Sequence, residues 1–321
     1  MGKRILVAGA GHGGLAAAAL LARAGLDVMV YEKQRKGTLG YDWTDIFAPT
    51  AWKAVRMPMP PKDMFEYKNN MTFLSPDHKT MFTQQIPEDE LEIKMERRDI
   101  YRLLIEQAEK FGGTIEYDCV VERPLMLGSR VAGLRTSGGD VYGDLGIDAA
   151  GLDSPVRTNL PKHCGIEKSP GAFEKFYVYR AFFDCPPGAE QDVKFKVYLF
   201  PNNQPGIAWV AAEEGYTDML IGRFAPFDEE EAKDTADFLR GSNPTLGRTV
   251  LRGGQFTTIP VRHPLGMMVF DGYAAIGDSA FMTVPIIGSG IANSLKAARM
   301  LADTILADRD GAYDFEHLWK Y

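Results

Sequence analysis

The chain opens with three apolar segments whose lengths and compositions predict a strand, a helix and a second strand. Residues 5–8 form a short apolar run of strand length. Residues 15–23 are rich in alanine and leucine, which favour helix, and residues 27–31 again have the composition of a strand. Alternation of strand and helix is typical of a sheet covered by helices, so this region is predicted to be α/β.

Glycines occupy the predicted turn between the first strand and the helix. Gly9, Gly11 and Gly14 have the spacing G-x-G-x-x-G. Gly9 would make the tight turn, Gly11 would let the backbone approach a pyrophosphate, and Gly14 would let the helix pack closely on the strand. The pyrophosphate would lie on the free N–H groups at the start of the helix. Glu32 ends the second strand, where an acid that binds an adenosine ribose is expected. The pattern predicts a dinucleotide site without distinguishing NAD from FAD.

An amphipathic helix and several short strands follow. Residues 96–110 place apolar side chains at positions 100, 103, 104 and 108, which is helical spacing. Later segments have strand composition, and the second and third of them flank a hairpin turn; they lie at 114–121, 130–136, 141–142 and 145–151.

Between about residues 154 and 260 the composition changes to that of a mostly antiparallel sheet. Segments of strand length are separated by Pro, Gly, Asn and Asp, at 176–183, 193–200, 207–211, 219–224 and 255–259. One helix is predicted at 228–239. The chain then returns to α/β character, with a strand at 271–278 and a long alanine-rich helix at 291–308.

These changes predict two domains, the second inserted into the first. The first domain is expected to comprise residues 1–40, 83–153 and 261–321, and the second residues 41–82 and 154–260. The aromatic and methionine side chains of segment 41–82 either line an apolar substrate cavity or pack beneath a long excursion of the chain. The final segment starts like a helix and stops, so a C-terminal extension is expected to have been lost.

Composition and charge exclude several classes of protein. With 45% hydrophobic and 25% charged residues, the chain has the composition of an ordinary soluble globular protein. Its net charge of −7 and the lack of a basic stripe argue against nucleic-acid binding. The three cysteines have irregular spacings that suggest neither disulfides nor a zinc site. No apolar run is long enough to span a membrane, so a cytoplasmic protein is expected, with peripheral membrane contact left open.

Four motifs together resemble those of FAD-dependent oxidoreductases of the para-hydroxybenzoate-hydroxylase fold, and within them the geranylgeranyl-reductase-like branch. The first is the glycine turn with Glu32. The second is RRDIYRLL, in which Arg97 matches a family arginine that approaches the flavin. The third is Gly277-Asp278, whose aspartate is implied to bind the ribityl chain. The fourth is the PIIGSG segment at 285–290, which resembles the loop that faces the isoalloxazine ring.

The resemblance covers most of the chain and implies a fold and a set of binding residues. The fold is α/β, with an FAD-binding Rossmann-like domain of the glutathione-reductase type and an inserted, mostly antiparallel β substrate domain. The implied cofactor-binding residues are Gly9, Gly11, Gly14, Glu32, Arg97, Val121, Gly151, Gly277, Asp278, Pro285, Gly288, Ser289, Gly290 and Ile291. The substrate-binding residues are expected to be Trp43, Tyr198 and Trp209, although a core role is the alternative for Trp209. No metal ligand is assigned.

One departure from the family pattern affects the electron donor. The family often carries A-D-G-x-x-S-x-x-R, whose aspartate touches flavin and pyridine nucleotide in the hydroxylases. Here Ala150 stands in place of that aspartate, while Gly151, Ser154 and Arg157 fit the remaining positions. NAD(P)H as electron donor is therefore left open, and a redox partner protein is an alternative source of electrons.

The leading functional hypothesis is a reductase or dehydrogenase that moves hydride between flavin N5 and a carbon–carbon bond of an apolar, lipid-like or aromatic substrate. The alternatives are an FAD-dependent monooxygenase that hydroxylates an aromatic ring and a flavin-binding protein without turnover. Asp42, Tyr41, Tyr198 and His263 are proton-donor candidates by residue type alone. No catalytic residue is assigned.

Overall fold

The computed structural model describes residues 2–285 and 288–321, and a mostly parallel six-stranded sheet lies at the centre of its first layer. The strand order is β18-β19-β12-β1-β2-β8. These strands are β1 (Arg4–Ala8), β2 (Asp27–Tyr31), β8 (Thr114–Glu116), β12 (Leu145–Asp148), β18 (Val269–Phe270) and β19 (Tyr273–Ala275). Strands β12, β1, β2 and β8 pair in parallel, and all five residues of β1 pair with β2. The predicted N-terminal α/β unit is confirmed.

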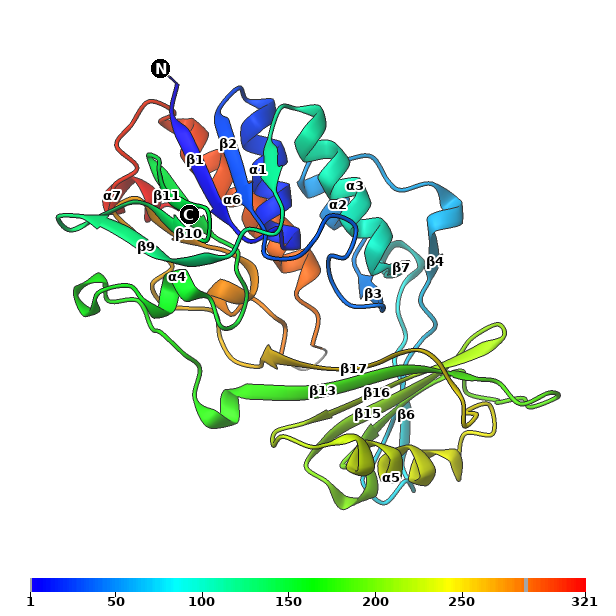
Figure 1. Ribbon diagram of the computed structural model, residues 1–321. Helices are drawn as coiled ribbons and strands as arrows, with labels where there is room; N and C mark the ends of the chain where they lie inside the picture. The colour runs from blue at the N-terminus through cyan, green and yellow to red at the C-terminus, as the bar shows by residue number, and fades with distance from the viewer. Residues whose placement is uncertain (1, 286–287) are drawn as a thin grey trace.

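Helices and a small sheet cover this central sheet. Helix α1 (His12–Arg23) packs between α3 (Arg97–Lys110) and α6 (Ile291–Ala307), as Figure 1 shows. An antiparallel sheet of β9 (Val121–Leu127), β10 (Arg130–Thr136) and β11 (Gly139–Tyr142) packs against the central sheet through β10. The short helices α4 (Pro155–Thr158) and α7 (Phe315–Leu318) complete the layer. This arrangement confirms the expected fold class.

The second layer is a seven-stranded sheet in the order β17-β13-β16-β15-β14-β5-β6. Its strands are β5 (Thr72–Leu74), β6 (Met81–Thr83), β13 (Lys175–Asp184), β14 (Phe195–Leu199), β15 (Gly206–Ala212), β16 (Tyr216–Arg223) and β17 (Val250–Pro260). All neighbours pair antiparallel except β14 and β5. Helix α5 (Glu229–Arg240) covers one face, and the other face points toward the first layer (Figure 1). The mostly antiparallel second sheet is confirmed.

Segment 41–82 is divided between the two layers. Strands β3 (Thr44–Phe47) and β4 (Phe65–Tyr67) pair with β7 (Ile93–Glu96), and α2 (Thr50–Ala54) packs on α6 in the main core. By contrast, β5 and β6 extend the seven-stranded sheet. The domain boundaries expected from the sequence remain a prediction, and the strand pairing favours assigning residues 44–67 to the first layer.

Several expected strands differ in extent from the observed ones, and two of these differences have a clear physical reason. The segment 114–121 is a strand only over 114–116, and β9 begins at Val121 and contains Pro124. Proline argues against a central strand, but β9 is an edge strand, where a missing N–H is tolerated. The segment 271–278 is a strand only over 273–275, since Gly277 has a φ of +65° and starts a turn. Among the helices of the described residues, none has the length and apolar character that crossing a membrane requires.

Candidate functional site

A cavity of about 940 Å³ joins the carboxyl ends of the central parallel strands to the inner face of the seven-stranded sheet. Ligands of open α/β sheets bind at the carboxyl ends of the strands. One half of the cavity is lined by residues of the glycine turn and of β2, and the other half by apolar side chains from β13, β14 and β15. The expected nucleotide and substrate regions therefore share one continuous space.

The glycine turn has the close contacts that its spacing predicts. Gly9 has a φ of +92°, and a Cβ there would lie 2.6 Å from the Ala149 carbonyl oxygen. A Cβ on Gly14 would lie 2.5 Å from the Gly9 oxygen, so only glycine permits this approach of α1 to β1. Gly11 is different: its backbone is extended and a Cβ would meet only the Ala149 oxygen, at 3.3 Å. Gly11 lines the cavity, so its missing side chain leaves space there for a ligand.

Glu32 is fixed at the end of β2 by backbone donors. The Ala10 N–H donates to Glu32 Oε2 and the Gln34 N–H donates to Oε1, both at 2.8 Å. A carboxylate has about four acceptor sites. These two bonds therefore orient Glu32, which lines the cavity, and leave it able to accept from the hydroxyls of a ribose.

Arg97 lies in the cavity wall as half of a partly buried ion pair. Its Nε donates to Asp45 Oδ2 at 2.6 Å and its Nη2 donates to Oδ1 at 2.5 Å. Burial alone would raise the pKa of Asp45, but the charge and hydrogen bonds of Arg97 outweigh it and the pKa is lowered. The guanidinium also lies over the rings of Tyr41 and Trp43, at 5.4 and 5.6 Å. Asp45 was not predicted from the sequence, and it reaches Arg97 through the pairing of β3 with β7.

His12 is a second residue that the sequence analysis missed. It is the first residue of α1, it lines the cavity, and its ring stacks on Tyr101 with centroids 4.4 Å apart. Its Nε2 is buried without a hydrogen-bond partner among the described residues. Burial and the nearby Arg97 charge lower the pKa of His12 to about 4. The imidazole is therefore neutral at pH 7, with one buried polar atom left unpaired among the described residues. Its position between Gly11 and Gly13 could have suggested this role.

The pKa of His12 predicts a loss of stability in mild acid. The folded pKa of about 4 lies below the ordinary value of 6.5, so between these values the unfolded state binds more protons than the folded state. We expect the free energy of unfolding to fall by about 1 to 2 kcal/mol from pH 7 to pH 5 because of this group. Urea titrations of the wild type and of His12→Phe at pH 7 and pH 5 measure this change in the free energy of unfolding. The variant should show a smaller pH dependence, and an equal dependence in both proteins would contradict this assignment.

The C-terminal part of the predicted cofactor site comes together around Asp278. Thr283 Oγ1 donates to Asp278 Oδ1 at 2.8 Å, and burial raises the pKa of Asp278. A Cβ on Gly290 would lie 3.4 Å from Asp278 Oδ1, so the start of α6 packs against this carboxyl group. Ser289 Oγ donates to the Ile46 carbonyl at 3.2 Å, which ties the loop to β3. Residues 286–287 of this loop lie outside the described residues.

Ala150 lines the cavity where the family pattern has an aspartate. The nearest acid in the sequence before it, Asp148, is fully buried and accepts hydrogen bonds from Ser154 Oγ at 2.6 Å and Tyr273 Oη at 2.9 Å. It also accepts from the backbone N–H groups of Ala150 and Arg157. Asp148 therefore holds the strand end together and does not replace the missing cavity carboxylate.

The substrate half of the cavity is apolar, and strand alternation decides which residues line it. Phe195 and Val197 of β14 face the cavity, as does Trp209 of β15. Tyr198, between Val197 and Leu199, faces α5 instead, where its hydroxyl is 2.9 Å from Ser242 Oγ and accepts from Asn243 Nδ2 at 2.7 Å. Tyr198 is absent from the cavity lining and is withdrawn from the substrate-binding set and from the proton-donor candidates. Trp43 and Trp209 both line the cavity.

Arg180 is a buried cation between the cavity and the sheet. Its Nη2 donates to Asp218 Oδ2 and to Thr44 Oγ1, both at 2.6 Å, and its guanidinium lies 4.8 Å from the Trp209 ring. Arg180 therefore orients Trp209 and joins the seven-stranded sheet to β3.

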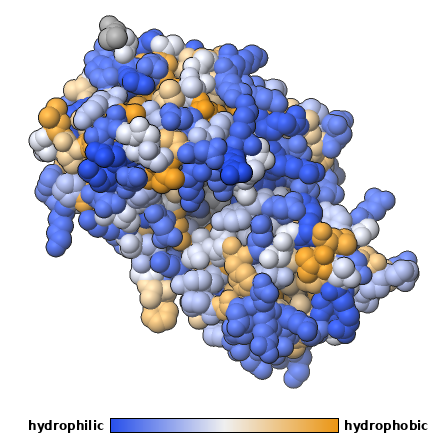
Figure 2. Space-filling view, in the orientation of Figure 1, coloured by the Kyte–Doolittle hydropathy of each residue, from blue (hydrophilic) through white to orange (hydrophobic). Residues whose placement is uncertain are grey.

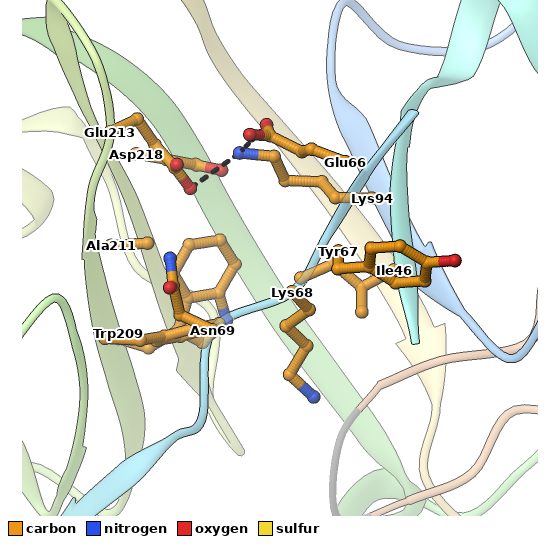
Figure 3. A pocket seen from close by; sticks show the side chains of 11 residues that line it. Ile46, Glu66, Tyr67, Lys68, Asn69, Lys94, Trp209, Ala211, Glu213 and Asp218 are labelled. Carbon is orange, nitrogen blue, oxygen red and sulfur yellow. Dashed lines mark ion pairs between the residues drawn. The ribbon is translucent and has the colours of Figure 1, made fainter. Parts of the chain in front are cut away.

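A small recess beside the cavity is closed by a second ionic cluster, shown in Figure 3. Lys94 Nζ lies 2.6 Å from both Glu66 Oε1 and Glu213 Oε1, between the two layers. Lys68, which lines both spaces, is paired with Glu92 at 2.6 Å. Because each lysine is paired with one or two glutamates, this end of the cavity is polar but carries no unpaired lysine among the residues that the structure describes.

The remaining proton-donor candidates differ in position. Tyr41 lines the cavity, and its hydroxyl accepts from Thr257 Oγ1 at 2.7 Å. Asp42 is paired with Arg252 at 3.1 Å, and His263 is exposed and absent from the cavity lining. Tyr41 is the one member of this group with a side chain in the cavity wall. No group of three or more His, Cys, Asp or Glu residues within 2–285 and 288–321 is placed to hold a metal ion.

The nucleotide end of the cavity fits FAD. Gly11 leaves space at the helix start, the His12 Nε2 is an orphaned polar atom, and two carboxyl groups, Glu32 and Asp278, lie at opposite sides of the lining. Anions are favoured at a helix N-terminus, and carboxyl groups accept hydrogen bonds from sugar hydroxyls. The site offers both a helix N-terminus for the pyrophosphate and carboxyl groups for the sugar hydroxyls.

Comparisons with known proteins agree with this geometry. Residues 7–67 match the family described as NAD(P)-binding Rossmann-like domain. The digeranylgeranylglycerophospholipid reductase of Sulfolobus acidocaldarius is 23% identical over 98% of this chain and 72% of its own length. The solved structure of a geranylgeranyl bacteriochlorophyll reductase-like protein from Thermoplasma acidophilum has a TM-score of 0.83 at 19% identity, covering 99% of this chain and 82% of that one. A probable FAD-dependent monooxygenase from Pseudomonas aeruginosa has a TM-score of 0.72 at 20% identity, covering 98% and 89%.

Proposed function

We propose that this chain is an FAD-dependent oxidoreductase of the geranylgeranyl-reductase-like branch and that it reduces carbon–carbon double bonds of an apolar, isoprenoid-like lipid. The observation that carries the proposal is the continuity of the cavity. One space of about 940 Å³ runs from the glycine turn to the apolar face of the seven-stranded sheet. A site of that form accommodates a long apolar substrate beside a dinucleotide.

Most of the proposed cofactor-binding residues line the cavity, whereas Gly14 and Pro285 do not. The start of α1 would hold the pyrophosphate, and Glu32 the adenosine ribose. Asp278 would bind the ribityl chain, and Arg97, held by Asp45, would contact the flavin. Val121 and Gly151 line the same cavity, as do Gly288, Ser289, Gly290 and Ile291. The residues added by the structure are His12, Asp45 and Tyr101.

Bound FAD supplies the hydride chemistry at its N5, and the chain supplies binding, exclusion of water and charge stabilisation. The N-terminus of α6, a helix of 17 residues, would favour negative charge near the ring. Phe195, Val197 and Trp209 present apolar surface that would exclude water from the reacting bond. Tyr41 is the proposed proton donor, since its hydroxyl is held by Thr257 at the cavity wall.

Two alternatives retain some support. An FAD-dependent monooxygenase is favoured by the fold it shares with the Pseudomonas protein. A flavin-binding protein without turnover is consistent with Ala150, which removes a carboxylate from the cavity. Ala150 also replaces the aspartate that touches pyridine nucleotide in the hydroxylases. We therefore propose a redox partner protein rather than NAD(P)H as the electron donor. We place the protein in the cytoplasm, in peripheral contact with a membrane that holds its lipid substrate.

Product analysis separates these functions. The reduced protein is incubated anaerobically with a digeranylgeranylglycerophospholipid, and the lipid is analysed by mass spectrometry. The proposal predicts a gain of two hydrogens for each double bond reduced. In air with the same lipid or an aromatic panel, a gain of oxygen would support the monooxygenase and overturn the proposal. An unchanged lipid with every electron donor tried would support the flavin-binding protein.

A further inference from the structure

The loop that leads into β13 exposes an aromatic side chain at its tip. Phe173 is 86% exposed, the highest value among the large apolar residues with exposed side chains. The green segment before β13 projects from the molecule in Figure 1, and Figure 2 shows apolar side chains at the same place on the surface. Burying a phenylalanine is worth about 2 kcal/mol, but single exposed apolar residues are common, so the significance of Phe173 rests on the charges and the cavity beside it.

The loop is held rigidly in this position. Arg262 Nη1 lies 2.5 Å from Glu167 Oε1 and 2.9 Å from Glu174 Oε2, so one guanidinium joins the two ends of the loop. The Arg157 Nε donates to the Lys168 carbonyl at 3.1 Å. These contacts fix the backbone of the loop to the buried core. Phe173 therefore projects from a loop that is anchored at both ends.

The charges around Phe173 favour an anionic surface. Segment 162–175 carries three lysines and two glutamates, and both glutamates are paired with Arg262. Within the part of the chain that the structure describes, no carboxylate pairs with the lysines, which are Lys162, Lys168 and Lys175. The chain as a whole has a net charge of −7 and would be repelled by an anionic membrane. Segment 162–175 therefore carries an excess of positive charge in the same stretch of sequence as the exposed ring, the reverse of that overall balance.

The loop adjoins the apolar cavity at the end nearest the proposed flavin ring. Phe224 is 45% exposed and packs edge-on against Phe176, with ring centroids 4.9 Å apart. Phe176 lines the cavity and pairs in register with Ile259, which also lines it. A Cβ on Gly288 would lie 3.1 Å from Ile259 Cδ1. A series of apolar contacts therefore links Phe224 at the surface to Gly288 of the 285–290 segment.

We propose that the 167–174 loop is a membrane-docking element that inserts Phe173 into an anionic lipid bilayer and places the Phe224–Phe176 side of the cavity at the bilayer surface. The proposal rests on the proposed function, since an apolar lipid substrate is what would enter there. One ring with neighbouring lysines is too small for a stable protein interface, which buries about 1,200 Å² or more. On a bilayer, each lysine and each inserted ring contributes separately to the binding free energy, which favours weak and reversible binding.

Vesicle sedimentation with the full FAD-loaded chain tests the proposal without any turnover, so its failure is distinct from failure of the proposed function. The vesicles contain phosphatidylcholine alone or with phosphatidylglycerol. We expect binding to the anionic vesicles that weakens with added salt. Phe173→Ser should bind about tenfold more weakly, and so should Lys168→Glu. The matched control is Leu127→Ser, which removes a 75% exposed apolar side chain from the end of β9 and should bind as the wild type does.

Several results would overturn the proposal. The wild type would not bind vesicles at all, or it would bind neutral and anionic vesicles equally well. Phe173→Ser would bind as tightly as the wild type, or Leu127→Ser would lose as much binding as Phe173→Ser does. Self-association that requires Phe173, seen by sedimentation velocity without vesicle binding, would assign the loop to a second copy of the chain. Retained flavin absorbance and circular dichroism in Phe173→Ser show that a loss of binding is not a loss of fold.

Discussion

Replacement of Gly11 with alanine is expected to weaken FAD binding by about 2 kcal/mol, or roughly 30-fold, with little change in the stability of the apoprotein. The backbone of Gly11 is extended, which alanine adopts without strain, and a Cβ would meet only one protein atom, the Ala149 oxygen at 3.3 Å. The new methyl group would instead occupy cavity space beside the helix start. It would hold the pyrophosphate away from the N–H groups that bind it.

The matched control for this variant is Gly9→Ala. A Cβ on Gly9 would lie 2.6 Å from the same oxygen, at a φ of +92°, so alanine there should reduce the free energy of unfolding by about 2 kcal/mol or more. FAD affinity is measured by quenching of flavin fluorescence on titration of apoprotein, and stability by urea unfolding. Wild-type affinity in Gly11→Ala would show that the pyrophosphate does not lie at this turn.

Removal of Arg180 is expected to be among the most destabilising single changes in the protein. Arg180→Met leaves Asp218, which is 1% exposed, as a buried charge without its bidentate partner, and it removes the donor to the Thr44 carbonyl. Breaking a buried pair in this way costs about 3 to 5 kcal/mol. Urea unfolding should show this loss. The double variant Arg180→Met with Asp218→Leu should recover part of it, since no unpaired charge remains.

The comparison pair for Arg180 is Arg135 with Asp140, which is also bidentate but lies in the exposed β10–β11 hairpin. Solvent screens such pairs, so Arg135→Met should change stability little. Equal effects of the two substitutions would contradict the account of Arg180 as a buried link between the seven-stranded sheet and β3.

Much of the nucleotide site could be predicted from the sequence because its determinants are local. Gly9, Gly11 and Gly14 act within one turn, and Glu32 ends the strand that pairs with β1. The predicted helix at 96–110 and the strands of the second sheet follow from periodicity, which short-range chemistry sets. The PIIGSG segment was identified from its family resemblance together with its position before a helix.

The missed residues depend on pairing between distant segments. Asp45 meets Arg97 only because β3 and β7 pair antiparallel, a register that no local pattern specifies. Tyr198 was expected to bind substrate, but it faces α5; alternation shows that neighbouring residues face opposite ways and does not show which face meets the cavity. Segment 41–82 has no single environment: β3 and β4 join the first layer and β5 and β6 the second. Its composition alone could not reveal that division.

The central claim is that a reduced flavin in this cavity passes hydride to an apolar double bond at the face of the seven-stranded sheet. A single-turnover experiment tests it most directly. Protein reduced anaerobically is mixed with a digeranylgeranylglycerophospholipid in detergent, and flavin absorbance is followed. We predict that the oxidised absorbance returns with the formation of an equal amount of saturated bond, and that a fully saturated lipid gives no return. Flavin that stays reduced with the unsaturated lipid, or is reoxidised only when oxygen is admitted, would contradict the account.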